Sequence, residues 1–257
     1  MATIYEVSRL AGVSLATVSR VINGSGKVRP ETRAKVEAAM RDLGYRPNAI
    51  AQSLASHRSN AVGVLVPELH GPFFVVMLSS IEDELRAAGK HVIITAGHSD
   101  EEVEKDSIQF LVSRQCDALI LHVYAVSDSY LLEQSAGPVP ISLIGRDLPE
   151  MSDRCFTIDN EQGGYLAAKA LIELGHRELA YLAGPLWKSD AKGRLAGYRR
   201  ALAEHGLAFD RKLLAEGNYQ EASGRWAMEQ LLRAGRPFSG LACGNDEMAT
   251  GAIAVAR

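Results

Sequence analysis

From residue 60 onward the chain alternates between apolar runs of strand length and amphipathic stretches of helical length. The run at 61–67 is continuously apolar, as expected of a strand buried on both faces of a sheet. A helical stretch at 73–88, ended by Gly89, and a strand at 91–96 follow it. This alternation constrains the fold more than any other feature of the sequence, because it predicts a doubly wound parallel sheet.

The alternation continues to the end of the chain and predicts a second sheet of the same kind. The expected helices lie at 101–114, 127–134, 161–174, 192–205, 222–234 and from 246, and the expected strands at 117–123, 140–145, 156–158, 178–183 and 239–243. Sheets of this kind bind ligands beyond the carboxyl ends of their strands. Two stacked sheets are therefore expected to hold a ligand in the crevice between them.

The first 58 residues differ from this α/β core, because they contain short helical patterns and no strand pattern. Thr3 and Glu6 match the Thr-x-x-Glu capping box and predict a first helix that Gly12 ends. A second helix is expected at 15–22, and a third at 30–43 with proline at its first position. This region is therefore expected to form a separate all-α head.

Charge divides the chain at the same place. Residues 1–58 contain nine Lys or Arg against four Asp or Glu, a net charge of +5, whereas the remainder contains 19 against 27, a net charge of −8. A small basic head on a larger acidic body is typical of a polyanion-binding module joined to a separate domain. A basic face that is only solvated and binds no polyanion would give the same net charge, so charge alone leaves both interpretations open.

Other sequence features exclude several classes of protein. No apolar run reaches 18 residues, which argues against a membrane partner, and the first residues lack the pattern of a secretory signal. Three widely spaced cysteines, Cys116, Cys155 and Cys243, predict reduced thiols in a cytoplasmic protein. The seven histidines lack the spacing of metal ligands, and the common hydrolase and metalloprotease motifs are absent, so we expect no enzyme, no metal and no cofactor.

The segment from Glu6 to Arg20 has the pattern of a helix-turn-helix, in which a tight glycine-containing turn positions a second helix for the major groove of DNA. The turn is expected at 11–13. Five apolar residues are expected to form a shared core: Val7, Leu10, Val13, Val18 and Val21. The pattern alone is also compatible with an unrelated small helical bundle.

The second helix is then expected to present its other side chains to DNA. Arg20 can donate two hydrogen bonds to a guanine edge, and Leu15 and Ala16 can contact thymine methyl groups. Phosphate contacts are expected from four short polar side chains, Ser14, Thr17, Ser19 and Asn23, and from the free N–H groups of the helix N-terminus.

Several strings in this region resemble the head of the lactose/galactose repressor family of bacterial transcriptional regulators. They are TIYEVSRLAGVSLATVSRVIN at 3–23, PETR at 30–33, LGYRPN at 43–48 and AQSLA at 51–55. The resemblance implies a hinge helix at 49–56, whose Leu54 would insert into the minor groove and kink the duplex. Arg29 departs from the family, which commonly has a capping Ser at this position.

The resemblance extends over the core, and the galactose repressors are the nearest branch. Its motifs are VGVLVP at 62–67, PFF at 72–74, RLAGY at 194–198 and CGNDEMA at 243–249. It implies a sugar effector in contact with five residues: Phe73, Asp190, Arg194, Asn245 and Asp246. A forked guanidinium, carboxylates and an aromatic ring suit the hydroxyls and the apolar face of a sugar. From the residues alone, core packing of Phe73 and a surface ion pair of Arg194 are the simpler interpretations.

The resemblance also implies a domain layout. A DNA-binding domain is expected at 1–58 and an effector-binding and dimerisation core at 60–257, with subdomains at 60–158 and 159–257. The chain stops at Arg257, where relatives of this family continue through further strands and helices. We therefore expect the second subdomain to be incomplete and to lack one acidic ligand contact.

Together these features predict a cytoplasmic transcriptional repressor of sugar-utilisation genes. It is expected to bind palindromic operator DNA as a homodimer, with an operator affinity controlled by a small sugar. A sugar-binding carrier protein is the alternative, because the core resembles periplasmic binding proteins. The basic head and the absence of a signal peptide argue against a carrier, which would bind sugar and not DNA.

Overall fold

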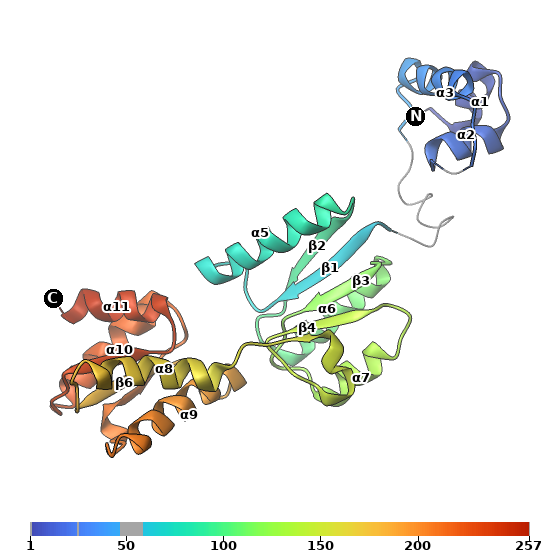
Figure 1. The fold of residues 1–257 in the computed structure, drawn as a ribbon. Helices are drawn as coiled ribbons and strands as arrows, with labels where there is room; N and C mark the ends of the chain where they lie inside the picture. The colour runs from blue at the N-terminus through green and yellow to red at the C-terminus, as the bar shows by residue number, and fades with distance from the viewer. Residues whose placement is uncertain (1, 25, 47–58, 257) are drawn as a thin grey trace. The chain divides into compact units, whose positions relative to one another are not determined.

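The structure, a computed structural model, describes residues 2–24, 26–46 and 59–256 (Figure 1). The predicted hinge helix at 49–56, with Leu54, lies outside these residues. The chain divides into two compact units: Met1–Pro67, Val76–Leu121 and Val126–Ile141 form the first, and Glu68–Val75, His122–Ala125 and Ser142–Arg257 form the second. The predicted domain limits remain predictions.

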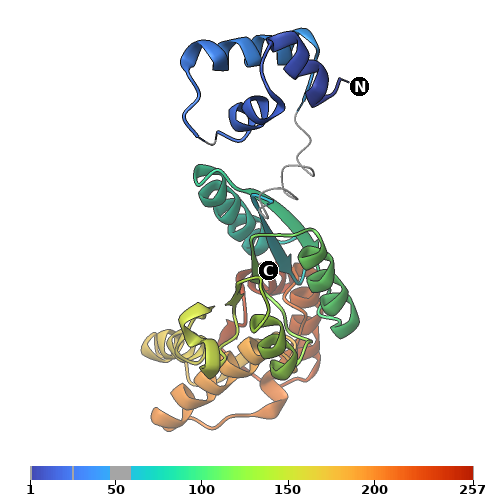
Figure 2. The ribbon, with the colours of Figure 1, turned by 90° about the vertical axis from the view of Figure 1, so that its right-hand side faces the viewer.

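Three helices form the described part of the head, α1 (Ile4–Ala11), α2 (Leu15–Ile22) and α3 (Pro30–Asp42) (Figure 1 and Figure 2). Their bounds lie within one residue of those predicted. The three helices pack around five buried side chains: Val7, Val18, Val21, Val36 and Ala39.

The prediction that Leu10 belongs to this core is wrong, because 55% of its surface is exposed. Ile4 and Ala11 lie on one flank of Val7 in the α1 helix, at spacings of three and four residues. Leu10 falls on the opposite flank and so faces solvent.

The first sheet has five strands in the order β2-β1-β3-β4-β5. They are β1 (Ala61–Val66), β2 (His91–Ala96), β3 (Ala118–Leu121), β4 (Ile141–Ile144) and β5 (Cys155–Phe156), and the connecting helices are α5 (Pro72–Ala87), α6 (Glu101–Ser113) and α7 (Asp128–Ser135). All six residues of β1 are buried, and β2 and β3 flank it in parallel. This confirms that the apolar run of β1 is a central strand of a parallel sheet.

The second sheet has three parallel strands in the order β7-β6-β8. They are β6 (Leu179–Ala183), β7 (Leu214–Glu216) and β8 (Gly240–Cys243). Alternate residues of β6 pack against different helices. Leu179, Tyr181 and Ala183 face α8 (Asn160–Glu173) and α9 (Ser189–Glu204). Ala180 and Leu182 face α10 (Glu221–Arg233) and α11 (Asp246–Ala256), so a helix pair covers each face of this sheet.

Glycines allow the helices of each pair to touch backbone to backbone. A Cβ atom on Gly164 of α8 would lie 1.9 Å from a carbonyl oxygen of α9, and one on Gly197 of α9 would lie 1.7 Å from a carbonyl oxygen of α8. Gly224 of α10 and Gly251 of α11 are related in the same way, with distances of 2.2 and 2.0 Å. Each crossing therefore has a glycine on both sides, and neither position has room for a side chain.

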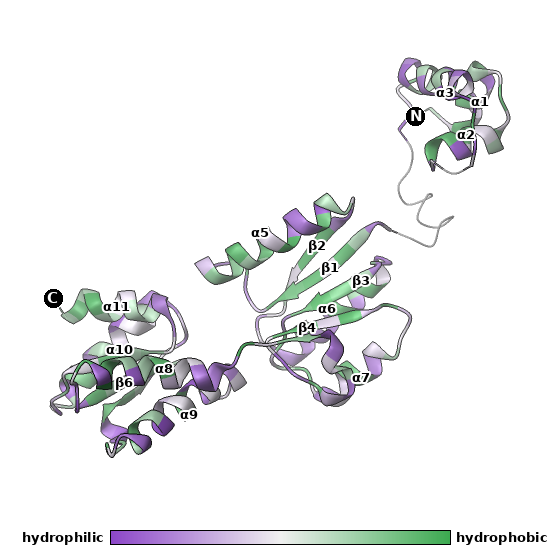
Figure 3. Ribbon diagram, in the orientation of Figure 1, coloured by the Kyte–Doolittle hydropathy of each residue, from purple (hydrophilic) through white to green (hydrophobic). Residues whose placement is uncertain are grey.

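Most predicted elements are present, with differences in bounds and a few additional short elements. Helix α9 begins at Ser189 and not at 192, which places Asp190 in its first turn. Strand β7 and two short 3-10 helices, Pro149–Arg154 and Arg211–Leu213, were not predicted. Hydrophobic residues are concentrated in the strands, whereas the helices carry both kinds of residue (Figure 3). None of the described helices has the length and apolar composition needed to span a membrane.

Candidate functional site

Helix α2 is fixed by its cap, by the preceding turn and by its buried face. The Ser14 hydroxyl accepts a hydrogen bond from the Thr17 N–H at 3.3 Å and caps the helix. Gly12 forms the turn with a φ of 66°, which favours glycine. Val18 and Val21 anchor the inner face of α2 in the core of the head. The outer face is thus held rigidly by its neighbours.

The three predicted base-contacting residues of α2, Leu15, Ala16 and Arg20, are all exposed. The stem of Arg20 passes close to Gly26, where an added Cβ would lie 3.6 Å from the arginine Cδ. Arg20 forms no ion pair with any residue that the structure describes, so its guanidinium can bind an external partner.

The four predicted phosphate-contacting residues pair with one another along the helix. The hydroxyls of Ser14 and Thr17 lie 3.0 Å apart, and the Asn23 amide donates to the Ser19 hydroxyl at 3.3 Å. Ser14 and Asn23 are exposed, whereas Thr17 and Ser19 are half-buried. Their contacts with DNA remain predictions.

The basic side chains of the head are not neutralised within it. In the described stretches between residues 2 and 46, no Lys or Arg takes part in an ion pair. Glu6, one of the few acids, is engaged in the capping box, where hydrogen bonds from the backbone and side chain of Thr3 lower its pKa. The cations therefore remain available for a polyanion.

In the second unit, Tyr219 gathers three of the five predicted effector residues. Its hydroxyl donates to Asp190 Oδ2 at 3.0 Å, and its carbonyl accepts a hydrogen bond from the Asn245 side chain at 2.7 Å. The guanidinium of Arg194 lies 5.7 Å from the centre of its ring. Asp190 and Arg194 are one turn apart on α9, and Asn245 precedes α11 and accepts from the Met248 N–H. We call Asp190, Arg194, Tyr219 and Asn245 the Tyr219 group.

Arg194 also joins three elements of the second unit. Its Nε donates to Asn160 Oδ1, at the start of α8, at 2.9 Å, and its Nη1 donates to the carbonyl oxygen of Gly244 after β8. The structure therefore shows hydrogen bonds to neutral groups in place of the surface ion pair considered above.

Phe73 lies in an aromatic cluster made of Phe73, Phe74, His122, Tyr124 and Trp187. The His122 ring lies 6.4 and 5.6 Å from the rings of Phe73 and Phe74 and 5.2 Å from that of Tyr124, which in turn lies 6.2 Å from Trp187. Phe73 is 59% exposed, so core packing does not account for its position.

Lys188 connects this aromatic cluster with the Tyr219 group. Its ammonium nitrogen lies 4.3, 5.2 and 6.0 Å from the ring centres of Tyr124, Trp187 and Tyr219. These distances suit cation–π attraction. Phe73, Asp190, Arg194 and Asn245 therefore belong to one continuous set of side chains.

Burial determines the ionisation state of His122 and Tyr219, two members of this set of side chains. It lowers the pKa of His122 to about 4, so the imidazole is neutral at pH 7. Burial and the neighbouring Asp190 raise the pKa of Tyr219 well above its usual value, which keeps its hydroxyl protonated as a donor. Two buried atoms, His122 Nδ1 and Asp190 Oδ1, have no hydrogen-bond partner among the described residues.

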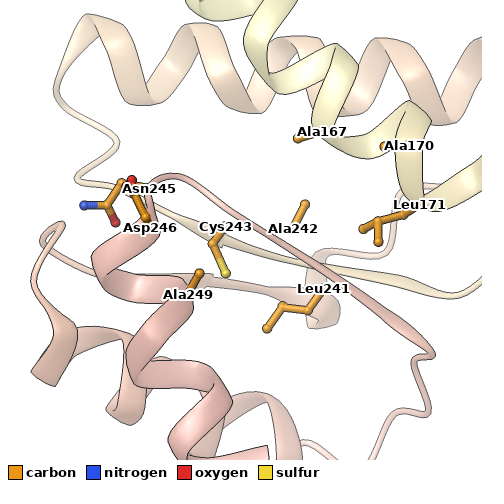
Figure 4. A pocket seen from close by; sticks show the side chains of 9 residues that line it. All are labelled: Ala167, Ala170, Leu171, Leu241, Ala242, Cys243, Asn245, Asp246 and Ala249. Atoms are coloured by element: carbon orange, nitrogen blue, oxygen red, sulfur yellow. The ribbon is translucent and has the colours of Figure 1, made fainter.

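Asp246 is placed apart from this set. It is an exposed residue at the start of α11, directly after Asn245, and its side chain forms no hydrogen bond or ion pair with the described residues of the Tyr219 group. Together with Asn245 it borders a shallow, mainly apolar pocket of about 330 Å³ beside β8 (Figure 4). The pocket is lined by Ala167, Ala170, Leu171, Leu241, Ala242, Cys243, Asn245, Asp246 and Ala249. It includes neither Phe73 nor Arg194.

Sequence reasoning missed Tyr219, His122, Tyr124 and Lys188. Tyr219 lies in a loop with an unusual φ of 72°, and His122 falls inside the strand predicted at 117–123, although β3 ends at Leu121. Of these four residues, only Tyr124 could have been found from the sequence, because it directly follows a predicted strand and ligands bind beyond the carboxyl ends of such strands. No group of His, Cys, Asp and Glu side chains suited to a metal ion occurs in the described part of the chain.

Two family profiles match the chain. Residues 3–48 match bacterial regulatory proteins of the lacI family, and residues 59–257 match the periplasmic binding proteins and sugar binding domain of the LacI family.

Individual relatives match along almost the whole chain. The HTH-type transcriptional regulator GalR of Escherichia coli K12 is 42% identical over 258 residues, covering 99% of this chain and 74% of that protein. A crystal structure of the lac repressor dimer bound to operator and the anti-inducer ONPF is similar with a TM-score of 0.87 at 31% identity, covering 99% of this chain and 77% of the other. A complex of the transcriptional regulator CelR with cellobiose has a TM-score of 0.67 at 31% identity, with the same coverage.

Proposed function

Because the chain belongs to the LacI family of bacterial regulatory proteins, we propose that it represses sugar-utilisation genes by binding operator DNA through α2, under the control of a small sugar. The observation that carries this proposal is the exposed outer face of α2, with Arg20 free of ionic partners among the described residues. The family is one of transcriptional regulators and not of enzymes.

In the proposed complex, α2 lies in the major groove. Arg20 reads a guanine, and Leu15 and Ala16 contact thymine methyl groups. The phosphate contacts come from four short polar residues, Ser14, Thr17, Ser19 and Asn23. The similar lac repressor is a dimer on its operator, and this supports a homodimer on a palindrome with half-sites about one helical turn apart. Such a protein acts in the cytoplasm, where the DNA is.

The proposed effector site is formed by the Tyr219 group and the aromatic cluster. The match to a sugar binding domain and the cellobiose complex of a relative support a sugar as the ligand. Asp190, Arg194 and Asn245 offer hydrogen-bonding groups for its hydroxyls, Phe73 offers a ring for its apolar face, and Asp246 is an additional proposed contact. A sugar that binds one core geometry better than another changes operator affinity by shifting the population of the two.

Selection of DNA from a random pool tests this function. The purified protein is expected to enrich a palindromic sequence, to bind it less tightly as the salt concentration rises, and to release it when one member of a sugar panel is added. Failure to enrich any sequence would contradict DNA recognition. Sugar binding without DNA binding would identify a carrier protein instead.

A further inference from the structure

Two unsatisfied polar atoms mark the effector site that the proposed function assigns. His122 Nδ1 and Asp190 Oδ1 are buried and lack a hydrogen-bond partner among the described residues. Only 5% of the His122 surface is exposed, so water has little access to the ring. A buried polar atom without a partner is costly, and a ligand that supplies one recovers that free energy.

A hydroxyl group is the partner that suits both atoms. The other ring nitrogen of His122, Nε2, lies 3.0 Å from the Tyr124 hydroxyl, so either of these two atoms can be the donor. In one tautomer Nδ1 donates and in the other it accepts, and a hydroxyl can do either. A carboxylate oxygen accepts hydrogen bonds, so Asp190 Oδ1 requires a donor, whereas Oδ2 already accepts from Tyr219.

The charges around these two atoms favour an uncharged ligand. Lys188 and Arg194 would repel a cationic group, and an anionic oxygen has no proton to donate to Asp190 Oδ1. The exposed rings of Phe73 and Trp187, 59% and 55% accessible, offer apolar surfaces: Phe73 contacts His122, and Trp187 contacts Tyr124, which contacts His122. A ring with several hydroxyls and an apolar face fits this combination.

We propose that His122 is a specificity-determining residue of the effector site, whose Nδ1 binds one particular hydroxyl of a neutral polyhydroxylated ring. Asp190 Oδ1 accepts a hydrogen bond from a second hydroxyl of the same ring, and Phe73 and Trp187 cover its apolar face. This inference rests on the proposed function and names the class of ligand and the residue that discriminates within it.

A packing role for His122 makes a different prediction. The ring lies close to Gly145, where an added Cβ would lie 3.0 Å from Nε2, so a change of its shape disturbs its surroundings. Such a disturbance lowers the binding affinity of every ligand by a similar factor. A hydrogen bond to one hydroxyl instead creates a dependence on that hydroxyl alone.

Calorimetric titration with deoxy sugars separates these two roles. The probes are neutral aldohexoses and, for each one that binds, its single-deoxy derivatives. In the unmodified protein, removal of one hydroxyl is expected to weaken binding on the order of tenfold to a hundredfold. The His122→Phe variant is expected to bind the parent sugar less tightly by a similar factor. It is also expected to bind the parent sugar and that deoxy sugar with equal affinity. His122→Asn, which keeps an N–H and a carbonyl, is expected to retain part of the preference.

His176→Phe removes an imidazole that hydrogen-bonds to Ser239, outside the site, and should leave the whole series unchanged. DNA binding and a single unfolding transition show that each variant is folded. If His122→Phe weakens all sugars equally, the inference is wrong while the proposed sugar control stands. If none of the aldohexoses binds the unmodified protein, this inference is wrong, whereas DNA recognition and control by another sugar of the wider panel are unaffected.

Discussion

The guanidinium of Arg20 extends from a rigidly packed helix, and its proposed role concerns one base pair. Arg20→Ala is therefore expected to cost about 1–3 kcal/mol of binding free energy at the selected operator and to relax the preference at a single position. Titration of the operator and of its single-base variants, monitored by fluorescence anisotropy, measures both effects.

Lys35→Ala is the matched control, because it removes an exposed positive charge from α3. It is expected to leave the base preference unchanged, and any loss of affinity should be the same for all sequences. A uniform loss for Arg20→Ala as well would contradict its role in base recognition.

His122 is expected to make the stability of the protein dependent on pH. Burial lowers its pKa from 6.5 to about 4, with a smaller opposing effect of Asp190. Below pH 6.5 the unfolded chain binds a proton that the folded protein does not accept until pH about 4. The free energy of unfolding should therefore fall by about 3 kcal/mol as the pH falls through this window.

Urea unfolding of the protein and of His122→Asn, measured between pH 7 and pH 4, checks this contribution. The difference between the two unfolding free energies should change across the window by the stated amount, because the other titrating groups are common to both. Parallel curves would show that His122 does not titrate abnormally.

At the scale of elements, the start of α3 lacks a side-chain cap. Arg29 occupies the N-cap position with extended backbone angles and makes no capping hydrogen bond. Arg29→Ser should place a hydroxyl within reach of the free N–H groups and stabilise the head by roughly 0.5–2 kcal/mol. Thermal unfolding followed by circular dichroism measures the gain.

Arg29→Ala removes the same charge without adding a cap, and it should give no comparable stabilisation. If both variants stabilise the head equally, charge and not capping is responsible.

The success of sequence reasoning varied with the length and regularity of the element. The capping box at Thr3 and the buried run of β1 are local patterns, and both were predicted from them. Strand β7 has only three residues, too few to show a hydrophobic pattern. Helix α9 starts at Ser189 without a side-chain cap, so no capping residue in the sequence indicated where it begins.

The candidate site was predicted less completely, because its members come from separate loops. The family resemblance supplied Asp190, Arg194 and Asn245, which the structure brings together. Tyr219 connects these three through its ring, its hydroxyl and its carbonyl, and no local pattern marks such a residue. Contacts between residues far apart in the sequence depend on the whole fold.

At the scale of the whole molecule, operator and effector are expected to influence each other equally. If a sugar lowers operator affinity by some factor, the operator must lower the affinity for that sugar by the same factor, typically 5- to 150-fold. Calorimetric titration of the sugar into the protein, with and without saturating operator, measures this factor. A DNA fragment of random sequence is the control, and a sugar affinity that saturating operator leaves unchanged would contradict the proposed coupling between the two sites.

The paired glycines of the helix crossings restrict how such a protein can diverge in evolution. At each crossing, no residue larger than glycine fits unless the facing backbone moves. A substitution of Gly164 or of Gly197 alone is therefore not tolerated. Asp190 and Arg194 are carried on one of the helices locked in this way. New ligand preferences in descendants of this chain should therefore arise by exchange of side chains around α9, such as Trp187 and Lys188, while the path of the helix stays the same.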